Sequence, residues 1–223
     1  MNEMAFLFLQ IMLINIVLSG DNAVVIAMAS QKLSVHQRKK AIWWGSFGAV
    51  ILRLVLTVIA VWLLEVPFIQ AAGSLLLLYI AVKLLTEEHG DKRVEGATSL
   101  GGAVRTIILA DFVMSLDNVL AIAAVARGET VLIIIGIALS IPLIIWGSTL
   151  IMRLLDRFPI LIYIGAAILG YTAGEMVLSD QVVGPMIQDF SPSLHEIMPF
   201  IGAMIVIISG LIKPYLTNRE KSH

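Results

Sequence analysis

The feature that most constrains this chain is a series of long apolar runs. A helix needs about 20 mostly apolar residues to cross the roughly 30 Å hydrocarbon core of a bilayer. Seven such runs, separated by charged clusters, cover residues 4–29, 41–64, 66–85, 103–126, 130–152, 158–178 and 197–212. We therefore expect an all-α polytopic membrane protein with seven transmembrane helices, which form a single transmembrane domain over residues 1–223.

Composition supports this class and excludes several others. Hydrophobic residues make up 59% of the chain and charged residues 14%, whereas about a quarter of a typical soluble domain is charged. The net charge of −1 offers no polyelectrolyte surface for nucleic acid. The chain has no cysteine, which excludes disulfides, iron–sulfur clusters and thiolate metal sites. Any metal ion must therefore be held by oxygen or nitrogen.

The basic residues predict an orientation, because cytoplasmic loops of membrane proteins carry an excess of Lys and Arg. Basic residues follow the first, third and fifth apolar runs and recur in the C-terminal tail, whereas the opposite side holds only Arg127. We expect a multi-pass protein of the cytoplasmic (plasma) membrane, with its N-terminus outside and its C-terminus in the cytoplasm. The segment 179–196 is then an external loop.

An internal repeat is visible in the sequence. The segment that starts at Ser19 (Ser-Gly-Asp-Asn) returns at Ser115 as Ser-Leu-Asp-Asn. Pro67, Gly73 and Tyr79 return as Pro159, Gly165 and Tyr171. Repeat one thus covers about residues 4–86 and repeat two about 103–178, with the seventh helix outside the repeat. Because each unit has three helices, the second enters the membrane from the opposite side. Such inverted repeats are typical of transporters with a site near the bilayer midplane.

Four ionisable residues fall deep within the apolar runs. They are Asp21, Arg53, Asp111 and Asp117. A charge at the bilayer centre costs from about 2.5 kcal/mol upward, so such residues usually face a cavity or a partner. Three acidic residues and one basic residue leave a formal charge of −2, which one divalent cation would neutralise. Asp21 and Asp117 are equivalent in the repeat, so a pseudo-two-fold axis would bring them to matching depths.

Further oxygen-bearing side chains share helix faces with these aspartates, because Asn15, Ser19 and Asn22 follow an i, i+4, i+7 stripe, as do Asp111, Ser115 and Asn118. The predicted metal ligands are Asp21, Asn22, Asp111, Asp117 and Asn118. Secondary candidates are Asn15, Ser19, Ser115, Arg53 and Glu175. A single polar residue in a membrane helix often only forms a hydrogen bond with a neighbouring helix. A structural role for Arg53, paired with Asp111 or another carboxylate, competes with a role in transport. The motif Gly170-x-x-x-Gly174 predicts close helix packing.

The predicted ligands are chemically hard. Carboxylate, amide and hydroxyl oxygens suit Mn, Mg or Ca, whereas Zn and Cu would recruit His, Cys or Met. The predicted ligands do not distinguish among Mn, Mg and Ca. No P-loop and no His-Glu-x-x-His motif is present, so we expect neither an ATP-driven pump nor an enzyme, and no permanently bound cofactor. Motion would come from one repeat rocking against the other around the site.

The motifs at Ser19 to Asn22 and Asp111 to Asn118 resemble those of the TerC family of bacterial integral membrane proteins, which is grouped with the LysE-type exporters. The resemblance covers the first six apolar runs, and this chain resembles the short, membrane-only members. It implies manganese efflux across the cytoplasmic membrane. Asp21, Asn22, Asp111, Asp117 and Asn118 stand at the matching motif positions.

Two other functions stay open at this stage. The first is export of another small solute, such as an amino acid, with Arg53 as the countercharge for a substrate carboxylate. The second is an accessory membrane subunit that supplies metal to, or assembles with, secretion machinery, with the charged segment 87–102 as its working surface. The expected partners are the lipid bilayer and a divalent metal ion. Assembly into a homo-oligomer or with other membrane proteins is also open.

Overall fold

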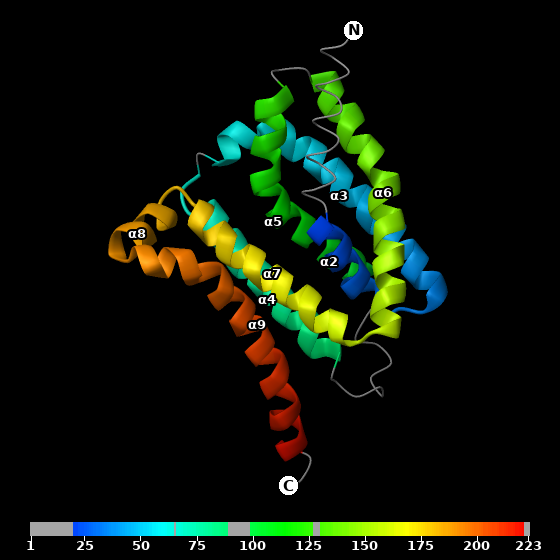
Figure 1. Cartoon of the computed structure of the whole chain (residues 1–223). Coiled ribbons are helices and arrows are strands. Elements are labelled where there is room, and N and C mark those ends of the chain that lie inside the picture. The colour runs from blue at the N-terminus through cyan, green and yellow to red at the C-terminus, as the bar shows by residue number, and fades with distance from the viewer. Residues whose placement is uncertain (1–19, 65, 89–98, 127–129, 221–223) are drawn as a thin grey trace.

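A computed structural model describes residues 20–64, 66–88, 99–126 and 130–220 of the chain, and all regular structure in these residues is helical. The helices are α2 (Gly20–Ser30), α3 (Val35–Leu64), α4 (Ile69–Glu88), α5 (Leu100–Ala126), α6 (Thr130–Arg157), α7 (Ile160–Ser179), α8 (Val183–Phe190) and α9 (Pro192–Glu220) (Figure 1). The all-α prediction is confirmed for this part of the chain.

Several helices are long and apolar enough to cross a bilayer. Among the described residues, four stretches meet both requirements, namely Val35–Thr57, Ile69–Thr86, Ile160–Ser179 and Pro192–Ile212. The predicted spans 103–126 and 130–152 fall on α5 and α6, which have 27 and 28 residues. Most of the first predicted span lies outside the described residues, and its end is the short apolar helix α2. The count of seven spans therefore stays a prediction.

Two helix starts differ from the expected ones. Helix α3 begins at Val35, before its apolar run, because Ser34 precedes it and the Ser34 hydroxyl donates to Gln37 Oε1 at 3.2 Å. A Ser followed three residues later by Gln is a helix-start signature. Helix α9 begins at Pro192, and proline suits the first position of a helix.

The prediction of a plain loop over residues 179–196 was wrong. This segment contains the whole of α8 and the first turn of α9. Val183, Met186, Ile187 and Phe190 follow the i, i+3, i+4, i+7 spacing of an amphipathic helix. An eight-residue helix is too short to be found by a search for membrane-spanning runs.

The helices form two groups (Figure 1). We call α2, α3, α5 and α6 the site bundle, and α4, α7 and α9 the packing bundle. Within them, the most extensive contacts join α3 to α5, α7 to α9 and α4 to α7. By contrast, α3 and α4 follow each other in the chain and scarcely touch. The three helices of one predicted repeat are therefore not a separate body.

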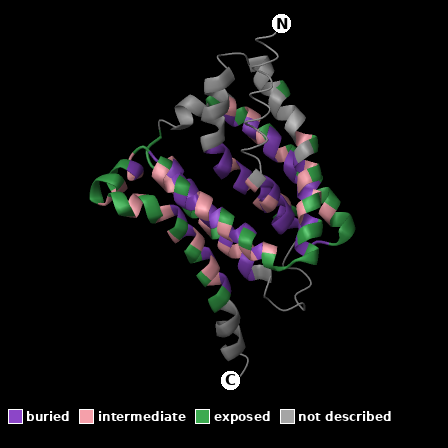
Figure 2. Ribbon diagram, viewed as in Figure 1, coloured by how far each residue is buried: buried purple, intermediate pink, exposed green. Residues whose placement is uncertain are grey.

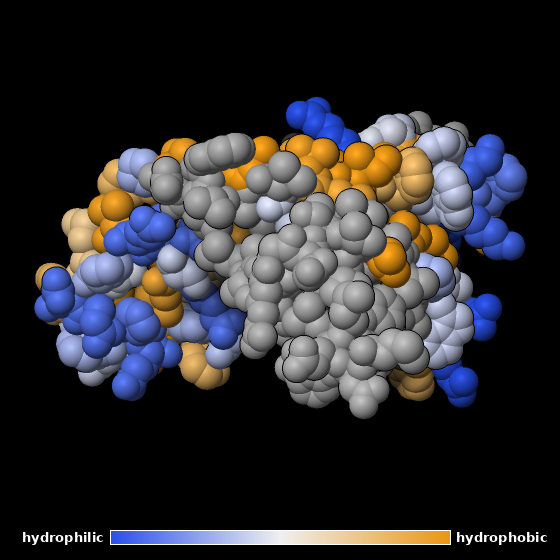
Figure 3. All heavy atoms as spheres, turned by 90° about the horizontal axis from the view of Figure 1, so that it is seen from above, coloured by the Kyte–Doolittle hydropathy of each residue, from blue (hydrophilic) through white to orange (hydrophobic). Residues whose placement is uncertain are grey.

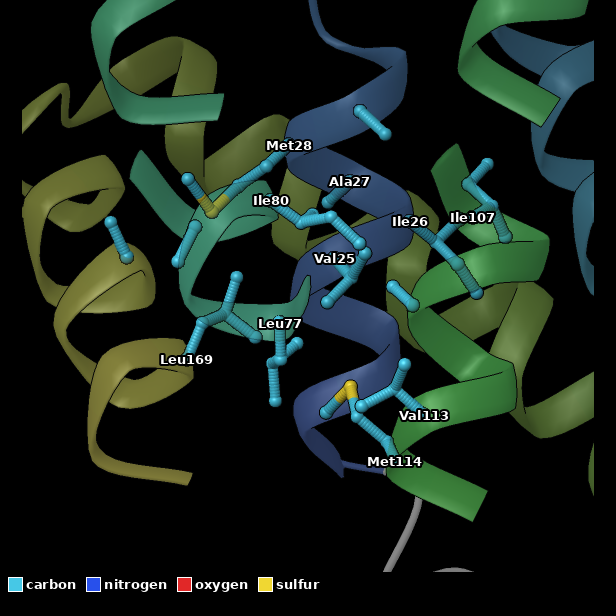
Figure 4. Packing of buried hydrophobic residues seen from close by; sticks show 14 of the residues in the cluster. Val25, Ile26, Ala27, Met28, Leu77, Ile80, Ile107, Val113, Met114 and Leu169 are labelled. Carbon is cyan, nitrogen blue, oxygen red and sulfur yellow. The ribbon is translucent and has the colours of Figure 1, made fainter. Parts of the chain in front are cut away.

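A hydrophobic core joins the two bundles, and α2 lies at its centre. Figure 4 shows Val25 and Met28 of α2 between Leu77 of α4 on one side and Val113 of α5 on the other. The buried residues of the central helices appear as a continuous band in Figure 2. Contacts of α4 with α5 and of α2 with α7 therefore hold the site bundle against the packing bundle.

Large hydrophobic side chains also point outward. On α3, Phe47, Ile51, Val55 and Ile59 are exposed at four-residue spacing and form one stripe along the helix. Figure 3 shows hydrophobic side chains along much of one edge of the molecule, with hydrophilic side chains toward its sides. An apolar outer surface of this kind suits contact with lipid.

Glycines bring α7 and α9 into backbone contact. A Cβ atom on Gly170 would lie 2.6 Å from the carbonyl oxygen of Gly202, and one on Gly174 would lie 2.6 Å from that of Met198. Neither carbonyl can move without bending its helix. The predicted role of Gly170 and Gly174 in close helix packing is confirmed.

Candidate functional site

A buried ion pair lies at the centre of the site bundle. Arg53, in the middle of α3, is 1% exposed, and its Nη2 donates to Asp111 Oδ1 of α5 at 2.6 Å. Its Nε donates to Ser115 Oγ at 3.0 Å, and the Ser115 hydroxyl donates to Asp111 Oδ2 at 3.2 Å. Asp111 and Ser115 stand one turn apart, so the planar guanidinium spans both. The pairing of Arg53 with Asp111 that the sequence predicts is present in the structure.

Close packing of α3 against α5 allows the Arg53 side chain to reach Asp111. A Cβ atom on Gly45 would lie 2.7 Å from Ile107 Cδ1, and one on Gly48 would lie 2.7 Å from Ile108 Cδ1. The two isoleucines therefore fill the space that the glycines leave open. This brings the axes of the helices close together over the two turns that precede Arg53, so its side chain reaches α5 directly.

Asp21 and Asn22 extend the cluster onto α2. Asp21 is partly exposed, and its carboxylate interacts electrostatically with both Arg53 and Asp111. Its Oδ1 accepts a hydrogen bond from the backbone N–H of Asn22 at 2.8 Å. The side chain of Asn22 is 2% exposed, and among the described residues neither its Oδ1 nor its Nδ2 has a hydrogen-bond partner. A buried amide without partners is costly, by about 1–3 kcal/mol.

The structure thus joins Arg53, Asp111 and Ser115 by hydrogen bonds and places Asp21 within electrostatic reach of Arg53 and Asp111, and Asn22 follows Asp21 in α2. Asp117 and Asn118 belong to α5, but their side chains lie outside the described residues, as do Asn15 and Ser19 altogether. Glu175 is exposed on α7, in the other bundle, and no hydrogen bond or ion pair within the described chain joins its carboxylate to the cluster.

The described side chains of the cluster can be compared with the ligands that a metal ion requires. It offers two carboxylates, one amide and one hydroxyl, all of them hard ligands. The described side chains contain no group of three or more His, Cys, Asp or Glu residues that could hold a metal ion. Arg53 engages Asp111, so the groups available to a cation are Asp21 and the amide of Asn22. Asp111 becomes available only when Arg53 moves.

Asp180 is a polar residue that the sequence analysis did not single out. It is 2% exposed and lies at the corner between α7 and α8. Its Oδ1 accepts from the backbone N–H groups of Val182 at 3.0 Å and Val183 at 3.1 Å, and its Oδ2 accepts from that of Ala71 in α4 at 3.1 Å. The bonds to Val182 and Val183 form an Asx-type turn, a local signal that could have been recognised.

The protonation of Asp180 reflects these contacts. Burial alone would raise the pKa of its carboxyl, but backbone N–H groups, first those of Val183 and Ala71, hold the pKa below its ordinary value. The ionised carboxylate thereby ties the first turn of α4 to the end of α7 within the packing bundle.

A second unforeseen contact joins two ends of the site bundle. Arg38 Nη1 donates to Asp156 Oδ2 at 2.7 Å, which links the first turn of α3 to the last turn of α6. The same guanidinium donates to the carbonyl oxygens of Leu33, at 2.9 Å, and Gln31. Since exposed basic residues follow on both helices, we call this end of the molecule the basic end. Its exposed members are Lys39, Lys40, Arg153 and Arg157.

Comparison with known proteins gives this architecture a family. The chain is 45% identical over 198 residues to "Uncharacterized membrane protein YjbE" of Bacillus subtilis (strain 168), which covers 89% of this chain and 90% of the relative. It is 28% identical over 218 residues to "Uncharacterized membrane protein YceF" of the same organism, covering 92% of this chain and 79% of the relative. No solved structure matches it significantly.

The family assignment rests on nearly the whole sequence. The model of the family described as "Integral membrane protein TerC family" matches residues 1–221. The chain belongs to the integral membrane protein TerC family.

Proposed function

We propose that this protein is a transporter that exports a divalent metal cation, with Mn²⁺ as the favoured cargo, through the charged cluster of the site bundle. The observation that carries the proposal is the excess of negative charge in a buried place. Among the described residues of the cluster, Arg53 is the only basic residue beside the two carboxylates of Asp21 and Asp111, and the buried side-chain amide of Asn22, the residue after Asp21, has no hydrogen-bond partner there. A cation would satisfy both the charge and the amide oxygen.

Arg53 gives the proposal a mechanism. Its guanidinium neutralises Asp111 in the structure. A divalent cation that binds Asp21 and Asn22 would compete with Arg53 for Asp111, because a doubly charged ion interacts more strongly with a carboxylate than a singly charged one does. Binding of the cation would thus loosen the contact between α3 and α5. That loosening couples occupation of the site to movement of the helices.

The helix contacts support alternating access by an inverted repeat. Under the predicted repeat, α2, α3 and α4 correspond to α5, α6 and α7. The contact between α3 and α5 then corresponds to that between α6 and α2, and both are present. The contact between α4 and α7 corresponds to itself, as expected for a pair on a pseudo-two-fold axis. We further propose that the basic end faces the cytoplasm of the plasma membrane.

The alternative of amino acid export is less well supported. It needs Arg53 as a countercharge for a substrate carboxylate, but Arg53 already donates to Asp111 and Ser115. No described residue favours the accessory-subunit alternative, and most of its proposed working surface lies outside the described residues.

Purified protein in liposomes that enclose a Mn²⁺-quenched dye tests the proposal. We expect wild type to move Mn²⁺, and Asp21→Asn, Asp111→Asn and Asp117→Asn each to lose at least the roughly ten-fold that even an outer-shell partner contributes. Asp189→Asn is the matched control, because Asp189 is exposed on α8. Cells that lack the protein should accumulate manganese. Full transport by the double variant Asp21→Asn/Asp117→Asn would overturn the carboxylate mechanism, and no transport by wild type would favour an accessory subunit.

A further inference from the structure

Three buried side chains lack hydrogen-bond partners, and all three lie on neighbouring helices of the site bundle. In the part of the chain that the structure describes, they are Asn22 and Ser30 of α2 and Ser46 of α3. Ser30 is 0% exposed and Ser46 1% exposed. A polar group shielded from water without a partner destabilises the folded state, so three of them in one region need an explanation.

Other hydroxyls in the same bundle are satisfied. Ser148 donates to the carbonyl oxygen of Ile144 at 2.6 Å, Thr149 to that of Ile145 at 2.7 Å and Thr57 to that of Arg53 at 2.8 Å. This bond to the residue four positions earlier is the usual way for Ser and Thr to be accommodated within a helix. Ser30 and Ser46 do not make it. Their hydroxyls are thus held available for another group.

The three side chains lead from the charged cluster toward the basic end. Ser46 and Arg53 are seven residues apart, so they share one face of α3, and Ser46 lies about 10 Å nearer the basic end. Asn22 and Ser30 are eight residues apart on one side of α2, with Ser30 about 12 Å nearer that end. Helices α2 and α3 contact each other and are joined by a short turn. We call the interior of the site bundle between the charged cluster and this turn the seam, and the three polar side chains lie at successive positions along it.

A charged contact closes the far end of this seam. Arg38 holds the turn that follows Ser30 through the carbonyl oxygens of Gln31 and Leu33, and it pairs with Asp156 of α6. The pair is partly exposed, with 24% and 46% of the two side chains accessible. It is therefore open to solvent and can separate at low cost.

We propose that Ser46, Ser30 and Asn22 line a path that is closed in this structure, that takes up water when Arg38 and Asp156 separate, and along which the cation passes between the charged cluster and the basic end. This inference rests on the proposed function and adds the route to it. Hydroxyl and amide oxygens spaced along the seam can replace part of the water shell of a hard cation as it moves. They carry no charge of their own, so the cation does not remain bound to them.

Single cysteines test the path directly, because the chain has none of its own. Ser30→Cys and Ser46→Cys would be treated from the basic end with 2-aminoethyl methanethiosulfonate, a small cation whose sulfur is attacked by hydrated thiolates, with release of methanesulfinate. The matched control is Ala81→Cys, since Ala81 is 0% exposed within the apolar core of α4. We expect both Ser variants to react about ten-fold faster than the control or more, because a thiol in apolar surroundings stays protonated. Mn²⁺ should slow both reactions.

The outcomes separate the path from the function. Reactivity of Ser30→Cys and Ser46→Cys as low as that of Ala81→Cys, in variants that still transport, would overturn the path and leave the transporter intact. Fast labelling of both Ser variants in a protein that transports no Mn²⁺ would support the hydrated path but contradict Mn²⁺ as the cargo. A second variant does not depend on labelling: Ser46→Ala should transport more slowly at an unchanged half-saturating Mn²⁺ concentration. A wild-type rate for Ser46→Ala would contradict the path.

Discussion

The site bundle and the packing bundle differ in whether their buried polar groups have hydrogen-bond partners. In the packing bundle, the buried carboxylate of Asp180 accepts several backbone hydrogen bonds, and Gly170 and Gly174 bring α7 and α9 into backbone contact. In the site bundle, a buried ion pair lies beside an amide and two hydroxyls that have no partners. Among the described residues, the buried polar groups of the packing bundle have hydrogen-bond partners and its helices are closely packed. The site bundle retains buried polar groups without partners.

This difference indicates a division of labour. A region whose polar groups are all paired gains nothing from rearranging, so it is suited to be a fixed support. A region with unpaired groups can gain contacts when a guest binds, because the guest can satisfy what the protein does not. On the proposed mechanism, the loosening of α3 from α5 takes place within the site bundle, while the packing bundle stays in place.

The largest effect should come from breaking the ion pair of the site bundle. Arg53→Leu leaves the buried carboxylate of Asp111 without its charged partner, and loss of one member of a buried pair costs about 3–5 kcal/mol. We expect thermal unfolding in detergent to reveal this loss, and the double variant Arg53→Leu/Asp111→Leu to recover most of it. Equal stability of the single variant and wild type would show that the charges of this bundle are not energetically coupled.

The next effect should come from the packing bundle. Gly170→Ala forces a Cβ against the carbonyl of Gly202, and overpacking of this kind costs about 1–3 kcal/mol. Gly101→Ala is the matched control, because a Cβ there would meet nothing within 4 Å. The free energy of unfolding should fall for the first and hold or rise slightly for the second. An unchanged free energy of unfolding for Gly170→Ala would contradict the view of this bundle as a closely packed support.

A smaller effect should distinguish the bundles by pH. The folded state depresses the pKa of Asp180, so its stabilising contribution is present above about pH 4 and is lost as the carboxylate is protonated below that. Asp180→Asn should cost about 1–3 kcal/mol at neutral pH, because an amide nitrogen would face backbone N–H groups. Unfolding measured against pH should then show a shallower acid limb than in wild type. An unchanged acid limb would mean that the carboxylate does not tie α4 to α7.

The smallest effect on stability should come from the contact between Arg38 and Asp156. Because both side chains are partly exposed, Asp156→Asn should change the free energy of unfolding by less than about 1 kcal/mol. It should nevertheless speed the labelling of Ser30→Cys from the basic end. A large loss of stability with no change in labelling would make this contact structural.

Sequence reasoning located the helices where apolar runs and helix starts coincide. The predicted run 158–178 matches α7, because Pro159 and Asp180 bound both the apolar run and the helix. Prediction from the sequence failed for the start of α3 and for α8. Hydropathy indicates where lipid begins, whereas hydrogen bonding decides where a helix begins. Arg38, Lys39 and Lys40 are charged and yet helical.

The candidate site was only partly predictable for a similar reason. Arg53 and Asp111 could be paired from the sequence because few opposite charges occur within the apolar runs. The unpaired hydroxyls of Ser30 and Ser46 could not be foreseen, since an ordinary bond to the preceding turn is equally compatible with their sequence. The grouping of helices was also hidden, because repeat symmetry identifies equivalent helices and not the ones that touch.

Helix α9 has a consequence for the proposed transport cycle. An inverted repeat alone would make the inward-open and outward-open forms mirror each other in energy. Helix α9 has no counterpart in the repeat, and it lies against α7 more extensively than against α4. Its presence makes the two forms unequal, so the resting protein would favour one side of the membrane even without cargo.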